Sequence, residues 1–188
     1  MCGRYTGYVD DSEELKTIYT LAKRSYPNTK FKEGEIFPTD TVPVIINNNA
    51  RLAAVPASWG IPGYGSPKCI INGRCETILE RPTFRDSFLR HRCIVPTTGY
   101  YEWNSAKQRF IFNLSGERVV YLGGIYNIYP DSLRFVILTV NATGDAASVH
   151  KRMPLVLTKD ILRRWEYETD FATSLLTSPA PHMLMREA

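Results

Sequence analysis

The sequence predicts an α+β fold built on a mostly antiparallel sheet, in a single domain that spans residues 1–188. Three observations support this class. Short apolar runs follow one another at hairpin spacing in the second half of the chain, helical periodicity is confined to a few segments, and aromatic residues, which favour strands, reach 12%. A hydrophobic content of 44% in 188 residues is enough for a core that needs no disulfide or structural metal.

The first sixty residues predict one helix and one hairpin. Asp11 or Ser12 can cap a helix that Pro27 limits downstream. Apolar runs at 42–46 and 51–59 then predict a β-hairpin. The residues that carry these assignments are Leu15, Ile18, Tyr19 and Ala22 in the helix, Asn47, Asn48 and Asn49 in the turn, and Pro43 and Pro56, which indicate sheet edges or bulges.

The middle of the chain predicts a loop and a short helix. Residues 60–70 are rich in Gly and Pro and predict a loop. Thr83 followed by Asp86 resembles a capping box, which predicts a short amphipathic helix that ends near a strand beginning at Arg92. The segment from 60 to 92 therefore interrupts the strands on either side of it.

The second half of the chain is dominated by strands. Neighbouring strands joined by short turns pair locally, which implies an antiparallel sheet. Thr158 can cap a last helix, and the pattern is lost at Pro179 and Pro181. The predicted strands are 93–103, 110–114, 119–125, 133–140 and 153–157, and the helical positions after Thr158 are Ile161, Leu162 and Trp165.

The net charge of +4 is unevenly distributed along the sequence. Residues 1–60 carry 7 basic and 7 acidic side chains, residues 61–110 carry 8 and 4, and residues 111–188 carry 8 and 8. A local basic excess interleaved with aromatic residues suits the binding of a polyanion, because cations neutralise phosphates and bases stack on aromatic faces. A solvated basic face is the alternative interpretation.

The cysteine spacing and the apolar runs exclude several classes of protein. Four cysteines without a C-x-x-C pair or an export signal predict reduced thiols in a cytoplasmic protein. The runs 42–46 and 119–125 are too short to span a membrane, so we expect no membrane partner. The conceivable zinc ligands Cys69, Cys75, His91 and Cys93 do not have the usual spacing, so we expect no metal and no cofactor.

Cys2 is the first residue that suggests chemistry. Removal of Met1 is normal before a small side chain and would leave a free α-amine and a thiol on adjacent carbons. Both groups titrate near neutral pH in model peptides, so a usable fraction of each is nucleophilic there. The amine can serve as the base for the thiol in an amidohydrolase, or it can form an imine with an aldehyde that the thiol then closes to a thiazolidine. A cysteine at position 2 by chance is the third possibility.

Three further residues are candidates for the same chemistry. Asn72 lies in an Asn-Gly pair, which is equally a strong signal for a hairpin turn. Strand alternation places Glu102 and Tyr100 on one face, and Tyr101 and Trp103 on the other. The Glu102 carboxylate therefore faces aromatic surface and suits general acid catalysis, although an exposed strand glutamate fits too. His150 precedes a strand and suits proton transfer, or it merely packs.

Four dispersed motifs together resemble the SOS-response-associated peptidase (SRAP) family. They are Met-Cys-Gly-Arg-Tyr, Ile-Asn-Gly-Arg-Cys-Glu-Thr, Arg-Cys-Ile-Val-Pro-Thr-Thr-Gly-Tyr-Tyr-Glu-Trp and His-Lys-Arg-Met-Pro-Leu-Val-Leu, in this order. The resemblance implies a curved, barrel-like antiparallel sheet with peripheral helices and a positive cleft. It also implies a monomer that senses abasic sites in single-stranded DNA and shields them through a covalent thiazolidine link to the amino-terminal cysteine.

The resemblance also assigns roles to individual residues. Cys2 is the expected nucleophile, Asn72 positions it and the sugar, and Glu102 and His150 form an acid/base pair. The expected DNA contacts are Arg4, Arg74 and Arg152 at phosphates, together with Tyr64, which stands where many relatives have a tryptophan pair, and Pro38, Arg85 and Thr139.

Two other functions remain open at this stage. A cysteine peptidase or amidohydrolase would use Cys2 as its nucleophile, in the simplest case to remove its own Met1, and would need an oxyanion hole. A noncovalent single-strand-binding module would need the basic segment and the aromatic residues but not Cys2. The enzymatic interpretation favoured here is a lyase-like crosslinking activity on abasic DNA.

Overall fold

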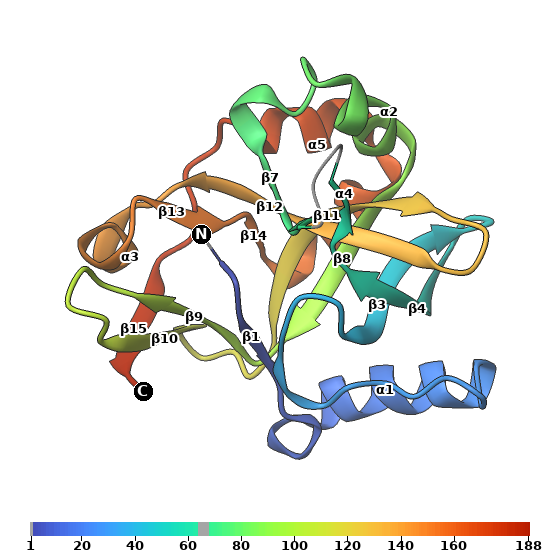
Figure 1. The fold of residues 1–188 in the computed structure, drawn as a ribbon, viewed down its shortest axis with the longest axis horizontal. Coiled ribbons are helices and arrows are strands. Elements are labelled where there is room, and N and C mark those ends of the chain that lie inside the picture. Colours follow the sequence, from blue (N-terminus) through green and yellow to red (C-terminus); the bar gives the residue numbers. More distant parts are fainter. Residues whose placement is uncertain (1, 64–67) are drawn as a thin grey trace.

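The computed structural model describes residues 2–63 and 68–188, which form two main sheets with helices around them (Figure 1). The strands are β1 (Tyr5–Gly7), β2 (Gly34–Ile36), β3 (Thr41–Asn48), β4 (Arg51–Trp59), β5 (Ile61–Pro62), β6 (Cys69–Ile70), β7 (Asn72–Arg74), β8 (Arg92–Thr97), β9 (Gly99–Trp103), β10 (Arg109–Leu114), β11 (Val120–Ile128), β12 (Leu133–Asn141), β13 (Arg152–Pro154), β14 (Val156–Leu157) and β15 (Met183–Glu187). The helices are α1 (Glu13–Ser25), α2 (Pro82–Arg90), α3 (Gly144–Val149), α4 (Leu162–Tyr167) and α5 (Thr169–Leu175), with 3₁₀ turns η1 (Val9–Asp11), η2 (Cys75–Thr77) and η3 (Lys159–Ile161).

Five strands of the larger sheet close into a ring. The order is β12–β4–β3–β8–β11, and β11 pairs with β12 to complete it. Fully buried side chains from these strands, among them Trp59, Ile94, Leu122 and Phe135, belong to the core. The curved, barrel-like sheet that the family resemblance implies is therefore confirmed, although β12 runs parallel to both β4 and β7.

The smaller sheet has the order β15–β10–β9–β1–β2 and is connected to the ring through β8, which leads into β9 at Thr98. Threonine hydroxyls join β1 to this corner: Thr97 Oγ1 donates to the Thr6 carbonyl oxygen at 2.6 Å. The hydroxyls of Thr6 and Thr98 also form a hydrogen bond at 2.8 Å. Gly99 allows the tight corner, since a Cβ there would lie 2.8 Å from the Phe112 carbonyl oxygen. The start of β1 is thereby held against β9.

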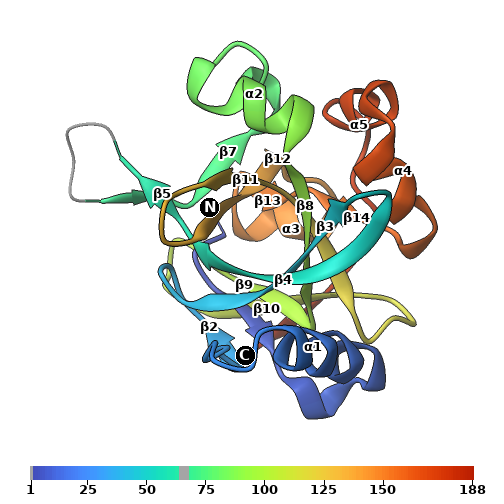
Figure 2. The same cartoon turned by 90° about the vertical axis from the view of Figure 1, so that its right-hand side faces the viewer.

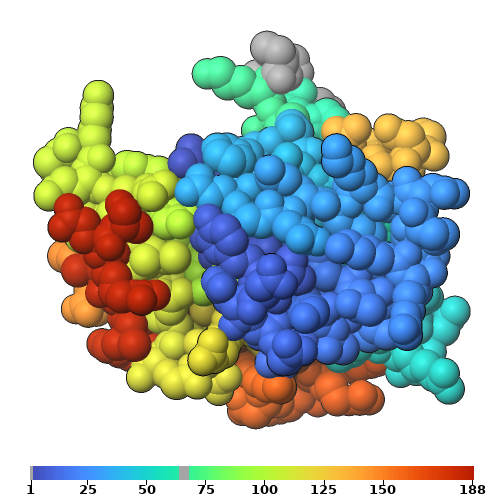
Figure 3. Space-filling view, turned by 90° about the horizontal axis from the view of Figure 1, so that it is seen from below, coloured from blue at the N-terminus to red at the C-terminus, as the bar shows by residue number. Residues whose placement is uncertain are grey.

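Helices cover the outside of the two sheets. Figure 2 shows α1 below the ring and α2, α4 and α5 above and beside it. In Figure 3, the blue residues of α1 and its neighbouring segments cover much of the underside, and the red C-terminal residues lie beside the yellow-green ones. The predicted first helix is confirmed, and Ser12 is its cap, because the Ser12 hydroxyl accepts from the Leu15 amide at 3.4 Å.

Two predicted helix caps are wrong, although the helices exist. Arg81, rather than Thr83, is the N-cap of α2, and the rigid ring of Pro82 starts the helix instead of a capping box. Thr158 likewise makes no side-chain cap, because η3 precedes α4. Proline at the first helical position needs no amide hydrogen bond, which explains why the helix forms without the box.

Several strand predictions also need correction. Pro43 and Pro56, expected to mark edges or bulges, face each other within strands that both belong to the ring, so neither strand is an edge strand. β3 meets β8 at Ile45 and β4 meets β12 at residues 57–59, so each proline stands at a point where its own strand has no second partner. The predicted loop at 60–70 contains the short β5–β6 pair.

The end of the chain contains two elements that the sequence does not predict. Residues 169–175 form α5, and residues 183–187 form β15, which pairs with β10 along its whole length. A five-residue edge strand carries too little periodicity to be recognised, and its partner is far away in the sequence. The final strand therefore depends on a nonlocal contact.

A buried carboxyl group connects α4 to the ring. Glu166 is 6% exposed, and its Oε2 accepts from the Asn47 amide at 2.9 Å. Burial raises the pKa of Glu166 to about 8, against smaller lowering effects of the Asn47 hydrogen bond and of the Arg92 charge. Among the described residues, Glu166 Oε1 has no hydrogen-bond partner. The folded chain therefore favours the protonated carboxyl.

This burial predicts a pH-dependent stability that Glu166→Gln removes. In the unfolded chain the carboxyl ionises at its ordinary pKa, so its contribution is fully present below that value and is lost as pH rises towards about 8. We expect the free energy of unfolding of the wild type to fall over this range relative to Glu166→Gln. Urea titrations at several pH values between 4 and 9 measure this, and Glu168→Gln, at an exposed position two residues later, is the control. Parallel curves for the wild type and Glu166→Gln would contradict the assignment.

Candidate active site

Cys2 lies three residues before Tyr5, the first residue of β1, and is completely buried. The Asn72 side chain donates from Nδ2 to the Cys2 carbonyl oxygen at 2.9 Å, and the Cys2 thiol lies 3.8 Å from the Arg4 carbonyl oxygen. In Figure 1 the blue segment that leads into β1 runs up to the region of β12 and β13. The candidate nucleophile is therefore held at the junction of the two sheets.

Glu102 shares this position with Cys2. It lies on β9, the neighbour of β1, and is 5% exposed. Burial and, secondarily, the Glu102 charge raise the pKa of the Cys2 thiol. The pKa of Tyr100 is also raised, by burial first and then by Cys2 and Glu102. The three groups are therefore electrostatic neighbours, and the predicted shared face of Tyr100 and Glu102 is confirmed.

The state of the thiol differs from the sequence-based expectation. A usable thiolate fraction at neutral pH requires a pKa near that of a free cysteine. The buried Cys2 thiol instead keeps its proton, because burial and a nearby carboxylate both disfavour the anion. Burial and the nearby carboxylate therefore work against the expected partial ionisation, and any attack by this sulfur has to be coupled to removal of its proton.

Asn72 is on a strand and not in the hairpin turn that its Asn-Gly pair also suggested. β7 lies parallel to β12, with Asn72 opposite Ile137. Gly73 permits this close packing, since a Cβ there would lie 2.9 Å from Ile78 Cδ1. Within the described part of the chain, the buried Asn72 Oδ1 has no hydrogen-bond partner, so it remains available as an acceptor beside Cys2.

His150 follows α3, and its ring is oriented by the backbone of Arg152. The Arg152 amide donates to Nδ1 at 3.0 Å, and the Arg152 carbonyl oxygen lies 3.1 Å from the same nitrogen. Nδ1 accepts from the amide in one tautomer of the ring and donates to the carbonyl oxygen in the other. Arg152, on β13, contacts Thr139 of the neighbouring strand β12. β12 also pairs with β7, which carries Asn72.

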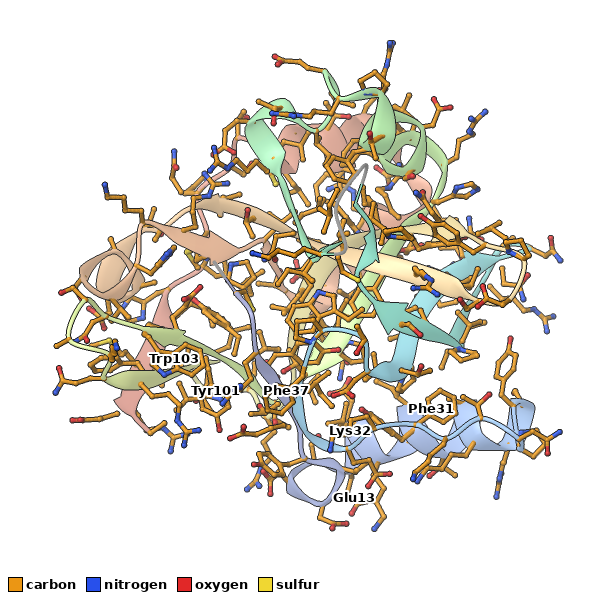
Figure 4. The ribbon with its side chains drawn as sticks, viewed as in Figure 1. Glu13, Phe31, Lys32, Phe37, Tyr101 and Trp103 are labelled. Atoms are coloured by element: carbon orange, nitrogen blue, oxygen red, sulfur yellow. The ribbon has the colours of Figure 1, made fainter. Side chains whose placement is uncertain are left out.

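Arg4 belongs to a row of arginine and aromatic side chains on the smaller sheet. Its guanidinium lies 4.3 Å from the Phe37 ring centroid and 5.1 Å from that of Trp103, and it pairs with Glu35 at 3.3 Å. Glu35 also binds Arg109 at 3.0 Å, and Arg109 lies over Tyr101. Figure 4 shows Trp103, Tyr101 and Phe37 next to one another along this sheet. We call Arg4, Phe37, Trp103, Tyr101 and Arg109 the Arg–aromatic row.

The other two expected phosphate contacts differ from each other. Arg74 is exposed at the end of β7. Arg152 is mostly buried, and its guanidinium is bound bidentately by Glu76. Thr139 is completely buried and its backbone carbonyl accepts from Arg152 at 2.5 Å, so it can act on DNA only through that arginine.

The remaining expected DNA contacts lie at the surface or outside the described residues. Pro38 is partly exposed in the turn after β2, next to Phe37 of the Arg–aromatic row. Arg85 is exposed on α2. Tyr64 lies outside the described residues. Hollows of about 500 and 530 Å³ lie elsewhere, against the β3–β4 hairpin and beside β15.

Several residues around the site escaped the sequence-based prediction. The alternation along β9 places Trp103 on the opposite strand face from Glu102 but gives it no role, and the spacing gives no sign of Glu35 or Arg109. The contacts of these residues with Arg4 and with each other form only when β1, β2, β9 and β10 lie together. The sequence signal that could have suggested Glu76 is its place two residues after Arg74 in the second motif.

In residues 2–63 and 68–188, no group of three or more His, Cys, Asp or Glu side chains is arranged to hold a metal. Cys2, Cys69, Cys75 and Cys93 are free thiols. Across the same ranges, the helices are too short or too polar to cross a bilayer.

Comparison with known proteins identifies the family of this chain. A family model described as SOS response associated peptidase (SRAP) matches residues 1–186. The chain belongs to this family. Among SRAP relatives, the abasic site processing protein YoaM of Bacillus subtilis is 27% identical, covering 94% of this chain and 85% of its own length. The abasic site processing protein YedK of Escherichia coli is 25% identical over 88% of this chain and 79% of its own.

Solved structures show the same fold at lower identity. A protein from Bacteroides thetaiotaomicron has a TM-score of 0.78 at 20% identity, covering 99% of this chain and 91% of its own. A protein from Bordetella bronchiseptica has a TM-score of 0.76 at 21% identity, covering 100% and 99%. The ring of strands and the smaller sheet are thus a shared SRAP architecture.

Proposed function

We propose that the protein recognises abasic sites in single-stranded DNA and links itself to them covalently through Cys2 once Met1 has been removed. The supporting observation is the convergence of Cys2, Asn72 and Glu102 at the junction of the sheets. The relatives named as abasic site processing proteins point to the same substrate. Single-stranded DNA suits such a site because no partner base has to be displaced before the sugar enters.

The proposed reaction begins with opening of the sugar. An abasic sugar is mostly a closed hemiacetal, and Glu102 or His150 can supply the acid and base that open it to the aldehyde. The Cys2 amine adds to the aldehyde carbon, and water leaves to give an imine. The Cys2 sulfur then attacks the same carbon, the C=N electron pair moves to nitrogen, and a thiazolidine forms with the net loss of one water.

Glu102 has a second task in this scheme. The buried thiol of Cys2 keeps its proton, so the sulfur needs a base when it attacks the imine. A buried carboxylate that is an electrostatic neighbour of the thiol can accept that proton and pass it to the ring nitrogen. In the same scheme, the Asn72 amide holds the Cys2 backbone through its carbonyl oxygen, which keeps the amine and thiol aligned.

The DNA strand is proposed to lie along cationic and aromatic groups near Cys2. In the Arg–aromatic row the partly exposed Arg4 offers a guanidinium for phosphate and the exposed Phe37 offers a ring for a base, and Arg74 adds an exposed cation. We propose the same role for Tyr64, Pro38 and Arg85. Thr139 does not touch the DNA in this proposal; its carbonyl oxygen accepts a hydrogen bond from Arg152 and holds that side chain in place.

The direct test is to mix Met1-processed protein with a single-stranded oligonucleotide that contains one abasic site. Denaturing gels and intact mass spectrometry are expected to show an adduct, without borohydride, that weighs one water less than the summed reactants. A matched oligonucleotide with a normal base is the control and gives no adduct. Absence of the adduct, with loss of Met1 verified by mass, would refute the proposal.

Glu102→Gln is expected to slow adduct formation by about 100-fold, the usual range for losing a positioned acid or base. Release of the DNA should slow as well, because the reverse reaction needs the same proton transfers. Single-turnover time courses with the abasic oligonucleotide measure formation, and transfer to a competing aldehyde trap measures release. Glu117→Gln, at an exposed position elsewhere, is the control. Unchanged rates in Glu102→Gln would remove Glu102 from the mechanism.

The adduct assay, run beside a hydrolysis assay on peptide substrates, separates the crosslinking proposal from a cysteine peptidase or amidohydrolase. A hydrolase that uses Cys2 needs a reactive sulfur, and its burial beside Glu102 disfavours the thiolate. Ring closure on a preformed imine makes a smaller demand, because attack and proton transfer occur within one bound molecule. Hydrolysis of peptide substrates without any DNA adduct would favour the hydrolase.

A further inference from the structure

The strongest ion pair near the candidate site joins Glu76 to Arg152. The Arg152 Nη1 lies 2.5 Å from Glu76 Oε1, and Nη2 lies 2.9 Å from Oε2, so the pair is bidentate. The Arg152 side chain is 12% exposed and that of Glu76 is 42% exposed. Glu76 is therefore the solvent-exposed partner of a largely buried arginine. A bidentate carboxylate has the same geometry on a guanidinium as two oxygens of a phosphate.

The other hydrogens of this guanidinium are also occupied. Nη1 donates to Asn141 Oδ1 at 2.7 Å, and Nη2 donates to the Thr139 carbonyl oxygen at 2.5 Å. With the two bonds to Glu76, all four Nη hydrogens have protein acceptors. The buried Nε has no hydrogen-bond partner among the described residues. A phosphate can reach the Nη groups of Arg152 only if one of these acceptors leaves.

Glu76 is the acceptor that a phosphate would replace, because it is the charged one. Thr139 belongs to the buried strand β12 and the exposed Asn141 is neutral, whereas Glu76 lies on the short turn η2 with its carboxylate facing solvent. The hydrogen bonds from Arg152, and more weakly the charges of Arg152 and Arg74, hold the pKa of Glu76 below its usual range. An ionised carboxylate thus stands between two cations that are expected to face DNA.

We propose that Glu76 is a specificity-determining residue that occupies the Arg152 guanidinium as a phosphate mimic and must be displaced by a backbone phosphate of the bound strand. This inference rests on the proposed function. Every strand, intact or abasic, has to displace the carboxylate, but only an abasic strand recovers that cost through the covalent bond to Cys2. Glu76 thereby weakens binding to intact DNA more than it limits capture of the lesion.

The test compares Glu76→Gln with the wild type on an intact single-stranded oligonucleotide. Fluorescence anisotropy over a range of salt concentrations is expected to show about 5-fold tighter binding for Glu76→Gln, and a salt dependence steeper by about 0.7 in log–log slope, which corresponds to one more phosphate neutralised. Glu80→Gln removes the same charge from an exposed position four residues away and is the control. It should leave the slope unchanged.

Two further variants make the result specific to Arg152. Adding Arg152→Gln to Glu76→Gln should cancel the gain, because no free guanidinium remains. Glu76→Asp, which keeps the charge on a shorter side chain that spans the fork less well, should show a smaller gain, and it carries the test if Glu76→Gln fails to fold. Unchanged or weaker binding by a folded Glu76 variant would overturn the proposal and make the pair a structural support.

The same preparations separate this inference from the proposed function. If the wild type forms an adduct with an abasic oligonucleotide but Glu76→Gln binds intact DNA no more tightly, the phosphate-mimic role is wrong and the crosslinking function stands. If the wild type forms no adduct, the crosslinking proposal fails. Tighter binding by Glu76→Gln with an adduct in the wild type supports both.

Discussion

Cys2→Ala is expected to abolish the stable adduct with an abasic oligonucleotide. The variant keeps an α-amine after Met1 removal, so it can still form a reversible imine, but without sulfur the thiazolidine ring cannot close. Denaturation should therefore release all of the DNA, whereas borohydride added beforehand should trap part of it. Intact mass spectrometry with and without borohydride distinguishes the two species.

Cys2→Ser and a second cysteine variant sharpen this result. Serine offers a hydroxyl in the same position, but it is a poorer nucleophile than sulfur, so Cys2→Ser should behave like Cys2→Ala. Cys69→Ser changes a half-buried cysteine on β6 and should leave the adduct unchanged. A stable adduct in Cys2→Ala without borohydride would mean that another group forms the link.

Arg92→Met should lower the free energy of unfolding by about 3 kcal/mol, because several buried carbonyl oxygens lose their donor and each costs about 1–3 kcal/mol when left unsatisfied. Arg92 is 6% exposed. Its guanidinium donates to the carbonyl oxygens of Trp165 and Phe88, each at 2.7 Å, and to that of Glu166 at 3.2 Å. These carbonyls belong to the last turns of α2 and α4, where helical oxygens have no internal partner. Methionine fills the space but leaves them unsatisfied.

Urea denaturation of Arg92→Met beside Arg90→Met measures this effect. Arg90 lies two residues earlier, is exposed and pairs with Asp86, so its replacement should change stability by no more than about 0.5 kcal/mol. The adduct rate of folded Arg92→Met should stay close to wild type, since Arg92 supports the helices and not the site. A loss below about 1 kcal/mol would show that water or rearrangement satisfies the carbonyls.

The sequence predicted the elements that depend on local chemistry. Ser12 caps α1 through its own hydroxyl, and the apolar positions of that helix face the core as their spacing indicates. The alternation around Glu102 correctly separated Tyr100 from Tyr101 and Trp103. Such features involve residues within one or two turns of chain, where periodicity carries the information.

Other predictions failed where a distant segment decided the outcome. Asn72 and Gly73 match a hairpin turn as a pair, yet packing against Ile78 and Leu138 makes them part of a parallel strand. Tertiary contacts commonly override short-range turn signals. For the same reason β15 was missed, since its only cue is a partner in β10.

The motifs alone were sufficient to name the candidate residues and the reagent that Cys2 can become, because an amine and a thiol on adjacent carbons are a property of the amino acid. The neutral state of that thiol, its place beside Glu102 and the occupation of Arg152 by Glu76 were decided by the tertiary structure. Burial and electrostatic neighbours depend on segments that meet across the fold, as Cys2 and Asn72 do over 70 residues. Desolvation acts on whatever those segments enclose, so ionisation and accessibility follow from the folded arrangement of the chain.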